Sequence, residues 1–188
     1  QAQAPQRLVE RVESIEEALG EALPVGYTSE LSPGLDDWIA SLADSLDDGV
    51  AFLFDYGVTR REYFARDRAD GWLRCYFRHH VHHDPLQLPG IQDLTAWVDF
   101  SAVAEAALNS GLEVAGYTAQ AQFLIAGGLD AEMQGFASLP VSRQLHLSGL
   151  VNSLTLPAEL GEPFICLGFG RGVCGCGWAV CVGGWGEC

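Results

Sequence analysis

Apolar residues recur every three or four positions in the segment 33–48, and this spacing predicts an amphipathic helix. Ser32 is a suitable N-cap, Pro33 fits the first turn, and Gly49 is a natural stop. The segment 6–22 mixes apolar and acidic residues, and its pattern fits either a short amphipathic helix or a strand followed by a turn. The apolar positions of the clearer helix are Leu35, Trp38, Ile39, Leu42 and Leu46.

Three short apolar runs predict strands that alternate with helices. The first run, residues 50–57, is continuously apolar, which is typical of a strand buried on both faces of a parallel sheet. An Ala-rich helix then follows, capped by Asp99 or Ser101 and closed by Gly111. Strands that alternate with helices predict an α/β sheet. The other predicted strands are 112–118 and 164–170, with a further helix over 119–129.

The segment 58–94 is rich in Arg, Tyr, His and Pro and has no clear periodicity, so we expect a long irregular loop. A loop of this length inside a compact domain is usually functional. The loop follows the carboxyl end of strand 50–57, where Asp55 and Tyr56 lie. Open α/β sheets bind their ligands beyond the carboxyl ends of their strands. In the alternative interpretation, Asp55 caps the next turn and the histidines form a solvated face.

The net charge of −15 is unevenly distributed along the chain. Residues 1–48 carry −9, whereas residues 60–78 carry +3. A strongly acidic chain repels phosphate backbones, which argues against nucleic-acid binding as the main role. No apolar run reaches the roughly 20 residues of a membrane-spanning helix. All ten basic residues are arginine, which indicates a GC-rich coding sequence.

Four of the five histidines lie between residues 79 and 83, so a metal site has to be considered. His79 and His83 have the spacing of a helical metal-binding pair, but Pro85 and a second proline at residue 89 disfavour a helix. Asp84 and Asp93 are the only nearby carboxylates that could complete a site. We therefore expect no metal, and keep a metal-dependent enzyme built on these histidines as an alternative.

The C-terminal tail, residues 173–188, has an atypical composition of Gly, Cys and Trp. Its glycines satisfy the G-x-G-x-x-G spacing after a strand, but no helix that could receive a pyrophosphate follows. Its cysteines do not have a common zinc-site spacing. A GC-rich gene read out of frame explains this composition better than a metal site does. The residues concerned are Gly170, Gly172, Gly175, Cys174, Cys176, Cys181 and Cys188.

Several longer motifs occur in one unbroken order between residue 26 and Gly172. They include GYTSE, RREYF and LPAELGEPF, and their order resembles that of the C-terminal half of the MidA-like S-adenosyl-L-methionine-dependent methyltransferases. That family includes the mitochondrial factor that methylates an arginine of a respiratory complex I subunit. The most specific motifs are FLFDYG (52–57), RADGWLRCYFRHHVHHDP (68–85), PGIQDLTAWVDF (89–100) and GLEVAGYTAQAQFL (111–124).

The resemblance implies an α/β fold of the class I type, a seven-strand, Rossmann-like methyltransferase fold whose N-terminal cofactor-binding half is missing. Strand 50–57 would be the fifth strand, and 112–118 and 164–170 the reversed pair at one edge. Residues 1–172 would be the C-terminal part of the methyltransferase domain, and 173–188 a tail that a frameshift could explain. The chain departs from the family pattern at Trp72, where the family has Thr, and at His83, where it has Asp.

The resemblance also implies that S-adenosyl-L-methionine is the cofactor of the complete protein and that the methyl acceptor is a protein arginine. Methyl transfer needs an aligned, neutral nucleophile. A carboxylate or imidazole could accept the guanidinium proton. We expect catalytic residues on the acceptor side and further residues that bind the substrate. The catalytic candidates are Asp55, His79, His82, Asp93 and Asp99, and the substrate-binding candidates are Tyr56, Gly57, Tyr76, Arg78 and Thr95.

Besides the metal-dependent alternative, two functions remain open for the chain itself. As the C-terminal portion of a protein arginine methyltransferase, it would be inactive alone because the cofactor site is missing. As an alternative, it is a non-catalytic binding or assembly module that acts through loop 58–94. The expected partner is a protein substrate, such as a respiratory complex I subunit, in a bacterial cytoplasm or, for eukaryotic relatives, in mitochondria.

Overall fold

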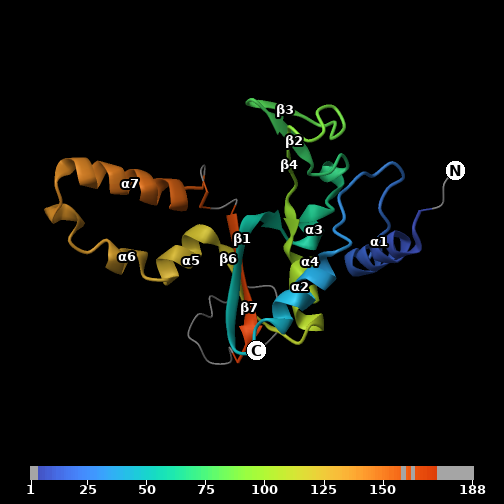
Figure 1. Cartoon of the computed structure of the whole chain (residues 1–188), viewed down its shortest axis with the longest axis horizontal. Coiled ribbons are helices and arrows are strands. Elements are labelled where there is room, and N and C mark those ends of the chain that lie inside the picture. The colour runs from blue at the N-terminus through green and yellow to red at the C-terminus, as the bar shows by residue number, and fades with distance from the viewer. Residues whose placement is uncertain (1–3, 158–159, 162–163, 173–188) are drawn as a thin grey trace.

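The computed structural model describes residues 4–157, 160–161 and 164–172. A central four-stranded sheet has helices α1–α4 on one side, a helical arm on the other and a small three-stranded sheet beyond one end (Figure 1). None of the helices in this described part is long and apolar enough to cross a membrane. The tail 173–188 lies outside the described residues, and of the glycines and cysteines singled out near the C-terminus only Gly170 and Gly172 are described.

The central sheet is mixed, with the strand order β5-β1-β7-β6. Strand β7 is antiparallel to β1 and to β6, whereas the two-residue strand β5 runs parallel to β1. The predicted strands 112–118 and 164–170 correspond to β6 and β7 and pair with each other at one edge of the sheet. The bounds are β1 Gly49–Val58, β5 Val98–Asp99, β6 Glu113–Ala119 and β7 Phe164–Arg171.

Strand β1 is not buried on both faces, which corrects one expectation from the sequence. Phe52 and Phe54 are 41% and 40% exposed, and each makes a T-shaped ring contact with Phe123 at a centroid distance of 5.2 Å. Their strand neighbours Ala51 and Leu53 face the opposite way, into the main core. A continuous apolar run therefore does not distinguish a doubly buried strand from one whose second face carries only a few aromatic contacts.

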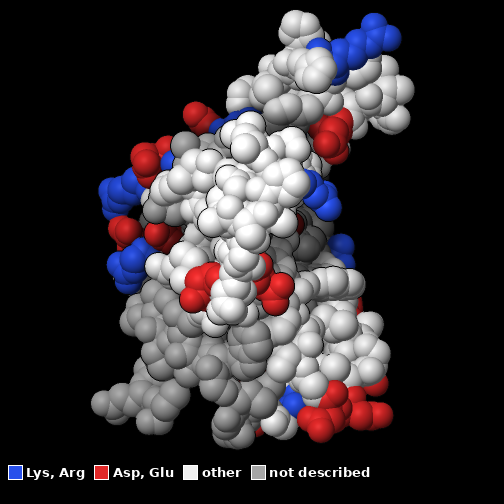
Figure 2. Space-filling model, turned by 90° about the vertical axis from the view of Figure 1, so that its left-hand side faces the viewer, with Lys and Arg blue, Asp and Glu red and all other residues white. Residues whose placement is uncertain are grey.

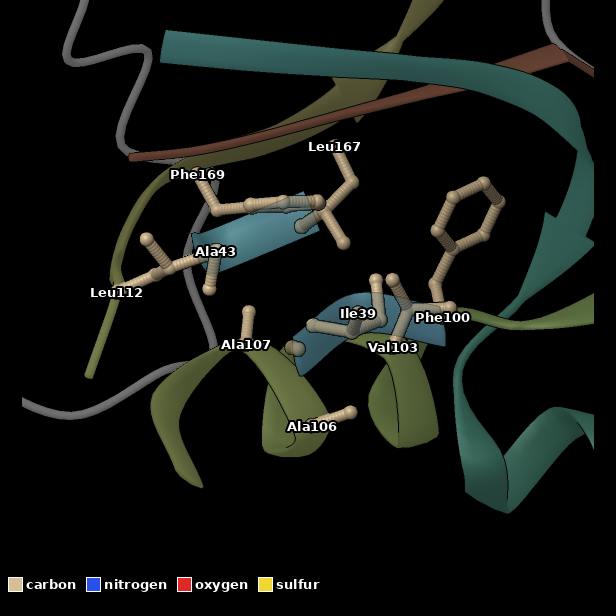
Figure 3. Packing of buried hydrophobic residues seen from close by; sticks show 10 residues of the cluster. Ile39, Ala43, Phe100, Val103, Ala106, Ala107, Leu112, Leu167 and Phe169 are labelled. Carbon is tan, nitrogen blue, oxygen red and sulfur yellow. The ribbon is translucent and has the colours of Figure 1, made fainter. Parts of the chain in front are cut away.

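The main core lies between the sheet and helices α2, Leu35–Asp44, and α4, Phe100–Asn109. In Figure 3 the side chains of Ile39, Phe100 and Val103 converge beneath the sheet residues Leu167 and Phe169. Alanines on α4 allow α2 and the sheet to approach closely, and seven of its ten residues are buried. Helix α2 begins at Leu35 with Gly34 as N-cap, so the predicted start at Ser32 and Pro33 was too early.

Helix α1, Gln6–Leu19, settles the ambiguity over residues 6–22 in favour of a helix. Its one buried residue, Ile15, joins a second hydrophobic cluster with Tyr63, Phe64 and Trp72. Tyr63 belongs to the short helix α3, Arg60–Tyr63. This second cluster connects the N-terminal helix to the segment that follows β1.

The helical arm consists of α5, α6 and α7 and leaves the sheet at the end of β6 (Figure 1). Helix α7 packs on α5, and Gln120 of α5 donates a hydrogen bond to the Leu154 carbonyl. The arm faces the viewer in Figure 2 and carries few charged side chains. Sequence analysis predicted α5 but missed the other two helices. The bounds are α5 Gln120–Ala126, α6 Leu129–Glu132 and α7 Val141–Thr155.

The segment 58–94 is not an irregular loop throughout, which corrects a second expectation. After α3 and the short 3-10 helix Arg66–Arg68, the chain forms an antiparallel sheet with the order β3-β2-β4. The strands are only three or four residues long, which explains why no periodicity was visible in the sequence. Their bounds are β2 Arg74–Phe77, β3 His80–His82 and β4 Asp93–Thr95.

Candidate functional site

The carboxyl end of β1 holds three of the predicted site residues. Asp55 is exposed, and its Oδ1 accepts a hydrogen bond of 2.7 Å from the Tyr56 backbone N–H. Because successive side chains of a strand point to opposite faces, Asp55 and Tyr56 present their side chains to different sides of the sheet. Gly57 is buried, and a Cβ atom there would lie 2.5 Å from the Phe100 ring and from the Val98 carbonyl oxygen. Glycine thus permits α4 to begin directly against the strand.

An aromatic stack extends from Tyr56 into the second hydrophobic cluster. The Trp97 ring is stacked on Trp72 at a centroid distance of 4.4 Å and lies parallel to Tyr56 within 23° at 6.3 Å. Phe164, the first residue of β7, tilts against Tyr56 at 4.2 Å, and Tyr63 lies 5.7 Å from Trp72. We call these five residues the aromatic stack. Tyr56, Trp97 and Phe164 are half-buried and form its outer end, whereas Tyr63 and Trp72 are buried.

Glu30 positions the inner end of the aromatic stack. Its carboxylate accepts hydrogen bonds from the backbone N–H groups of Trp72 and Leu73, at 2.8 and 3.1 Å. Gly71 precedes them with φ +73°, and a Cβ there would lie 2.5 Å from Glu30 Oε1. The Trp72 indole N–H also donates to the Tyr63 carbonyl at 2.9 Å. These bonds fix the orientation of the Trp72 ring on which Trp97 rests.

The environment of Tyr63 strongly disfavours ionisation of its hydroxyl group. Burial raises the pKa of Tyr63 well above its ordinary value of 10.0, and the nearby carboxylates of Glu30 and Asp99 raise it further. The phenol therefore remains protonated over the physiological pH range. It can serve as a hydrogen-bond donor, but it cannot act as a general base there.

Asp99 lies at the start of α4 and is tied into an ion-pair network. Its Oδ1 accepts a 3.1 Å hydrogen bond from the Ala102 N–H, so the predicted N-cap is confirmed, and Oδ2 lies 3.4 Å from Arg60 Nε. The Arg60 guanidinium also makes a bidentate pair with Glu105. Burial raises the pKa of Asp99, although the bonds from Ala102 and Arg60 counteract part of that rise.

Arg60 remains charged inside this network. Burial alone would lower the pKa of Arg60, but the hydrogen bonds to Glu105 and the charge of Asp99 raise it above its ordinary value. Its backbone N–H donates to the Ser101 hydroxyl at 2.9 Å. Arg60 and Glu105 also line an open groove of about 450 Å³ between α1 and α4, together with Glu17. The network thus links the segment after β1 to α4.

The histidine cluster belongs to the hairpin formed by β2 and β3. Arg78 and His79 connect the strands as a two-residue turn with positive φ at both positions, +47° and +68°, which is the backbone of a type I′ turn. Non-glycine residues rarely adopt such φ values. The Arg78 guanidinium lies 5.3 Å from the Phe77 ring centroid. Arg78 and His79 are both exposed at the tip of the hairpin.

His82 differs from His79 because its imidazole is enclosed. It pairs with the buried Cys75 across the hairpin, and both of its ring nitrogens are inaccessible to solvent without a hydrogen-bond partner in the described structure. The side-chain carbonyl oxygen of Gln92 is in the same state. Among residues 4–157, 160–161 and 164–172, no three His, Cys, Asp or Glu side chains are grouped as metal ligands would be.

The other predicted residues of this small sheet line up across its strands. Tyr76 of β2 pairs with Asp93 of β4, and both side chains are exposed. Thr95 pairs with Arg74. The predicted site is therefore divided into two groups of residues. Asp55, Tyr56, Gly57 and Asp99 lie at the end of β1, whereas Tyr76, Arg78, His79, His82, Asp93 and Thr95 lie on the small sheet.

Sequence reasoning missed the aromatic partners of Tyr56. Trp97 immediately precedes β5, and Phe164 begins β7 more than a hundred residues after Tyr56. An indicator was present in the sequence, because two tryptophans occur near the predicted substrate-binding residues. Their stacking depends on the pairing of β1 with β5 and β7, which local sequence does not specify.

Comparison with known families finds a match over most of the chain. Residues 2–118 match the family described as "Putative S-adenosyl-L-methionine-dependent methyltransferase". The chain is 35% identical over 130 residues to the mitochondrial protein arginine methyltransferase NDUFAF7 homolog of Drosophila melanogaster. It is 34% identical over 121 residues to mitochondrial NDUFAF7 of Danio rerio. These matches cover 68% and 63% of this chain, which spans only 28% and 26% of the two relatives.

Two solved structures from Burkholderia thailandensis resemble the fold. One is a COG1565 superfamily member bound to S-adenosyl-homocysteine, with a TM-score of 0.76 and 34% identity. The match covers 92% of this chain and 43% of that protein. A native structure of a COG1565 superfamily protein gives a TM-score of 0.75 at 36% identity, covering 87% of this chain and 44% of the other.

Proposed function

Because this chain belongs to the MidA-like family of S-adenosyl-L-methionine-dependent methyltransferases, we propose that it forms the C-terminal, acceptor-side part of a protein arginine N-methyltransferase. One observation carries this proposal: 92% of the chain superposes on less than half of a relative that holds S-adenosyl-homocysteine. The two curated relatives are named as arginine methyltransferases, which supports arginine as the acceptor.

In this proposal the cofactor is held by the part of the family fold that the chain does not span. The complete fold would be of the class I, seven-strand type, with residues 1–172 as its C-terminal portion. Two features support additional strands and helices around β1. Phe52 and Phe54 are exposed on one face of β1, and β5 pairs with β1 only at Gly57 and Val58 among the described residues. Further strands would continue along β1, and helices would cover its aromatic face. Alone, the chain would be inactive.

The chemistry proposed for the acceptor side requires alignment and removal of a proton. When bound, S-adenosyl-L-methionine would supply the methyl group and leave as S-adenosyl-homocysteine, while the guanidinium nitrogen would give its electron pair to the new N–C bond and lose a proton. Of the predicted residues, exposed Asp55 is the one proposed to accept this proton, which its carboxylate would reach around the carboxyl end of β1 from the face opposite Tyr56. Asp99 is already bonded to Arg60 and Ala102, which suits it better to positioning α4.

The small sheet would then bind the polypeptide around the acceptor arginine. Tyr76, Asp93 and Thr95 present polar groups across β2 and β4, and His79 is exposed at the hairpin tip. The partner in this proposal is a protein substrate, and a respiratory complex I subunit follows from the family resemblance alone. A bacterial cytoplasm is the proposed location, whereas the named relatives are mitochondrial.

A second candidate function, a non-catalytic binding module, is favoured by the apolar surface of residues 76–94. Val81 and Tyr76 are cross-strand neighbours with 54% and 41% exposure, and Leu86 in the following segment is 80% exposed. Exposed apolar residues gathered in one segment are typical of a protein-binding surface. Capture of a protein partner without any methyl transfer would favour this function.

The proposal is tested with a chimaera in which residues 26–172 replace the matching segment of the S-adenosyl-homocysteine-bound relative. We expect the chimaera to bind S-adenosyl-homocysteine and to transfer labelled methyl groups to arginine, whereas this chain alone does neither. The Asp55→Asn variant of the chimaera should keep cofactor binding and lose about 10²-fold or more in methyl transfer. Micromolar cofactor binding by this chain alone would contradict the placement of the cofactor, and methylation of lysine in place of arginine would contradict the acceptor.

A further inference from the structure

The outer end of the aromatic stack has the chemistry of a cation-binding surface. Aromatic faces carry a negative quadrupole and attract guanidinium groups within about 6 Å of the ring centroid. Trp97 and Tyr56 present nearly parallel faces, with centroids 6.3 Å apart, and Phe164 lies 4.2 Å from Tyr56. All three residues are half-buried, so part of each residue remains accessible to solvent.

The inner end of the same stack already binds a guanidinium group within the chain. The Arg68 Cζ atom lies over the Trp72 ring, 4.5 Å from its centroid. The Trp97 ring is stacked on the same indole, and the two ring centroids are 4.4 Å apart. The stack therefore holds a cation at one end through ring contacts, and its other end has similar rings without a cation partner among the described residues.

The spacings within the stack differ in a way that fits a flat ligand. Trp72 and Trp97 are in close contact, whereas the Tyr56 and Trp97 centroids are near the upper limit of about 7 Å for paired aromatic rings. Glu30 holds Trp72 rigidly through two backbone N–H groups, so Trp97 rests on a fixed base. Tyr56 is then the ring that would move to admit a ligand beside Trp97.

We infer that Tyr56, Trp97 and Phe164 bind the guanidinium group of the acceptor arginine and thereby determine specificity for arginine. This inference rests on the proposed function. Trp72 already covers one face of Trp97, so the guanidinium would enter on the side of Tyr56. The chain's net charge of −15 adds a general attraction for cationic segments.

The test uses the whole chain, labelled with ¹⁵N, and two small probes of equal shape. Nα-acetyl-arginine methylamide carries the guanidinium, and Nα-acetyl-citrulline methylamide is its uncharged counterpart. We expect the arginine probe to shift the Trp97 indole N–H resonance saturably and to bind at least about fivefold more tightly than the citrulline probe. Trp38, which is 53% exposed on α2, provides the internal control and should not shift.

Substitutions separate ring chemistry from general packing. Trp97→Leu and Tyr56→Leu should each weaken the arginine probe about fivefold or more, measured from backbone amide shifts at the end of β1. Trp97→Phe keeps an aromatic face and should retain most of the affinity, and Trp38→Leu should change nothing. Equal binding of both probes, or retained affinity in a folded Trp97→Leu protein, would overturn the inference. Arginine methylation by the chimaera would still support the proposed function in that case.

Discussion

Helices α4 and α7 illustrate how differently two parts of this chain are held. Seven of the ten residues of α4 are buried, and its alanines lie between α2 and the sheet. None of the fifteen residues of α7 is buried, and Leu145 and Val141 are each 70% exposed. Helix α4 is therefore held mainly by tertiary packing, whereas α7 relies on its contact with α5 and on local helix formation.

This difference implies that the two regions respond to substitution in opposite ways. Around α4, each atom has close neighbours, so a lost or added methyl group changes the free energy of unfolding. Along α7, a side chain can change with little effect on the fold, and its exposed apolar residues are free to serve another contact. The packed region thus determines stability, and the arm is the region open to sequence change.

The largest effect is expected from Phe169→Ala, at the centre of the packed region. Phe169 is fully buried in the core beneath the sheet, so its truncation leaves a cavity and should cost about 3–5 kcal/mol of unfolding free energy. The matched variant Leu145→Ala in α7 should stay within about 0.5 kcal/mol of the parent chain. Denaturant unfolding followed by circular dichroism measures both. Similar costs for the two variants would refute the contrast between the regions.

A smaller effect, of opposite sign in the two regions, is expected for glycine-to-alanine substitutions. The Cβ of Gly57→Ala would collide with Phe100 and the Val98 carbonyl, which should destabilise by about 1–3 kcal/mol. The Cβ of Gly149→Ala in α7 meets no atom within 4 Å and should stabilise by about 0.4–1 kcal/mol. The same unfolding measurement decides the signs. Destabilisation by Gly149→Ala would contradict the open space beside Gly149 on α7.

The effect that is smallest at neutral pH appears only at alkaline pH and concerns the buried thiol of β7. Burial raises the pKa of Cys166 from 9.0 to about 11, so the unfolded chain loses this proton first. Stability is unaffected below pH 9 and should fall as the pH rises from 9 to 11, by at most about 1.4 kcal/mol per pH unit. Unfolding titrations across this range should give a shallower slope for Cys166→Ala and an unchanged slope for Leu145→Ala. An identical slope for Cys166→Ala would remove the thiol as the cause.

The sequence predicted those elements whose periodicity is strong and local. Helices α2 and α4 and strands β1, β6 and β7 were expected within a few residues, and the N-cap role of Asp99 was confirmed. Helix α7 was missed because its apolar residues are distributed around the helix and form no single stripe. The strands of the small sheet were missed because three or four residues are too few to show alternation.

The candidate site was predicted in part, for a similar reason. Asp55 and Tyr56 could be placed at the strand end because strand direction follows from the pattern. Trp97 and Phe164 come close to Tyr56 only through the pairing of β1 with distant strands, and no local rule predicts this. The division of the predicted residues between the sheet end and the hairpin was likewise invisible before the fold was known.

The register of β6 and β7 has an evolutionary consequence for the arm. Ala119, the last residue of β6, pairs directly with Ile165 near the start of β7, so the two ends of the intervening segment are already neighbours. The arm is thus an insertion into what would otherwise be a simple hairpin. Such a segment can lengthen, shorten or be exchanged between relatives without altering the strand order. Exchange of the segment between these two points would leave the pairing of the four strands intact.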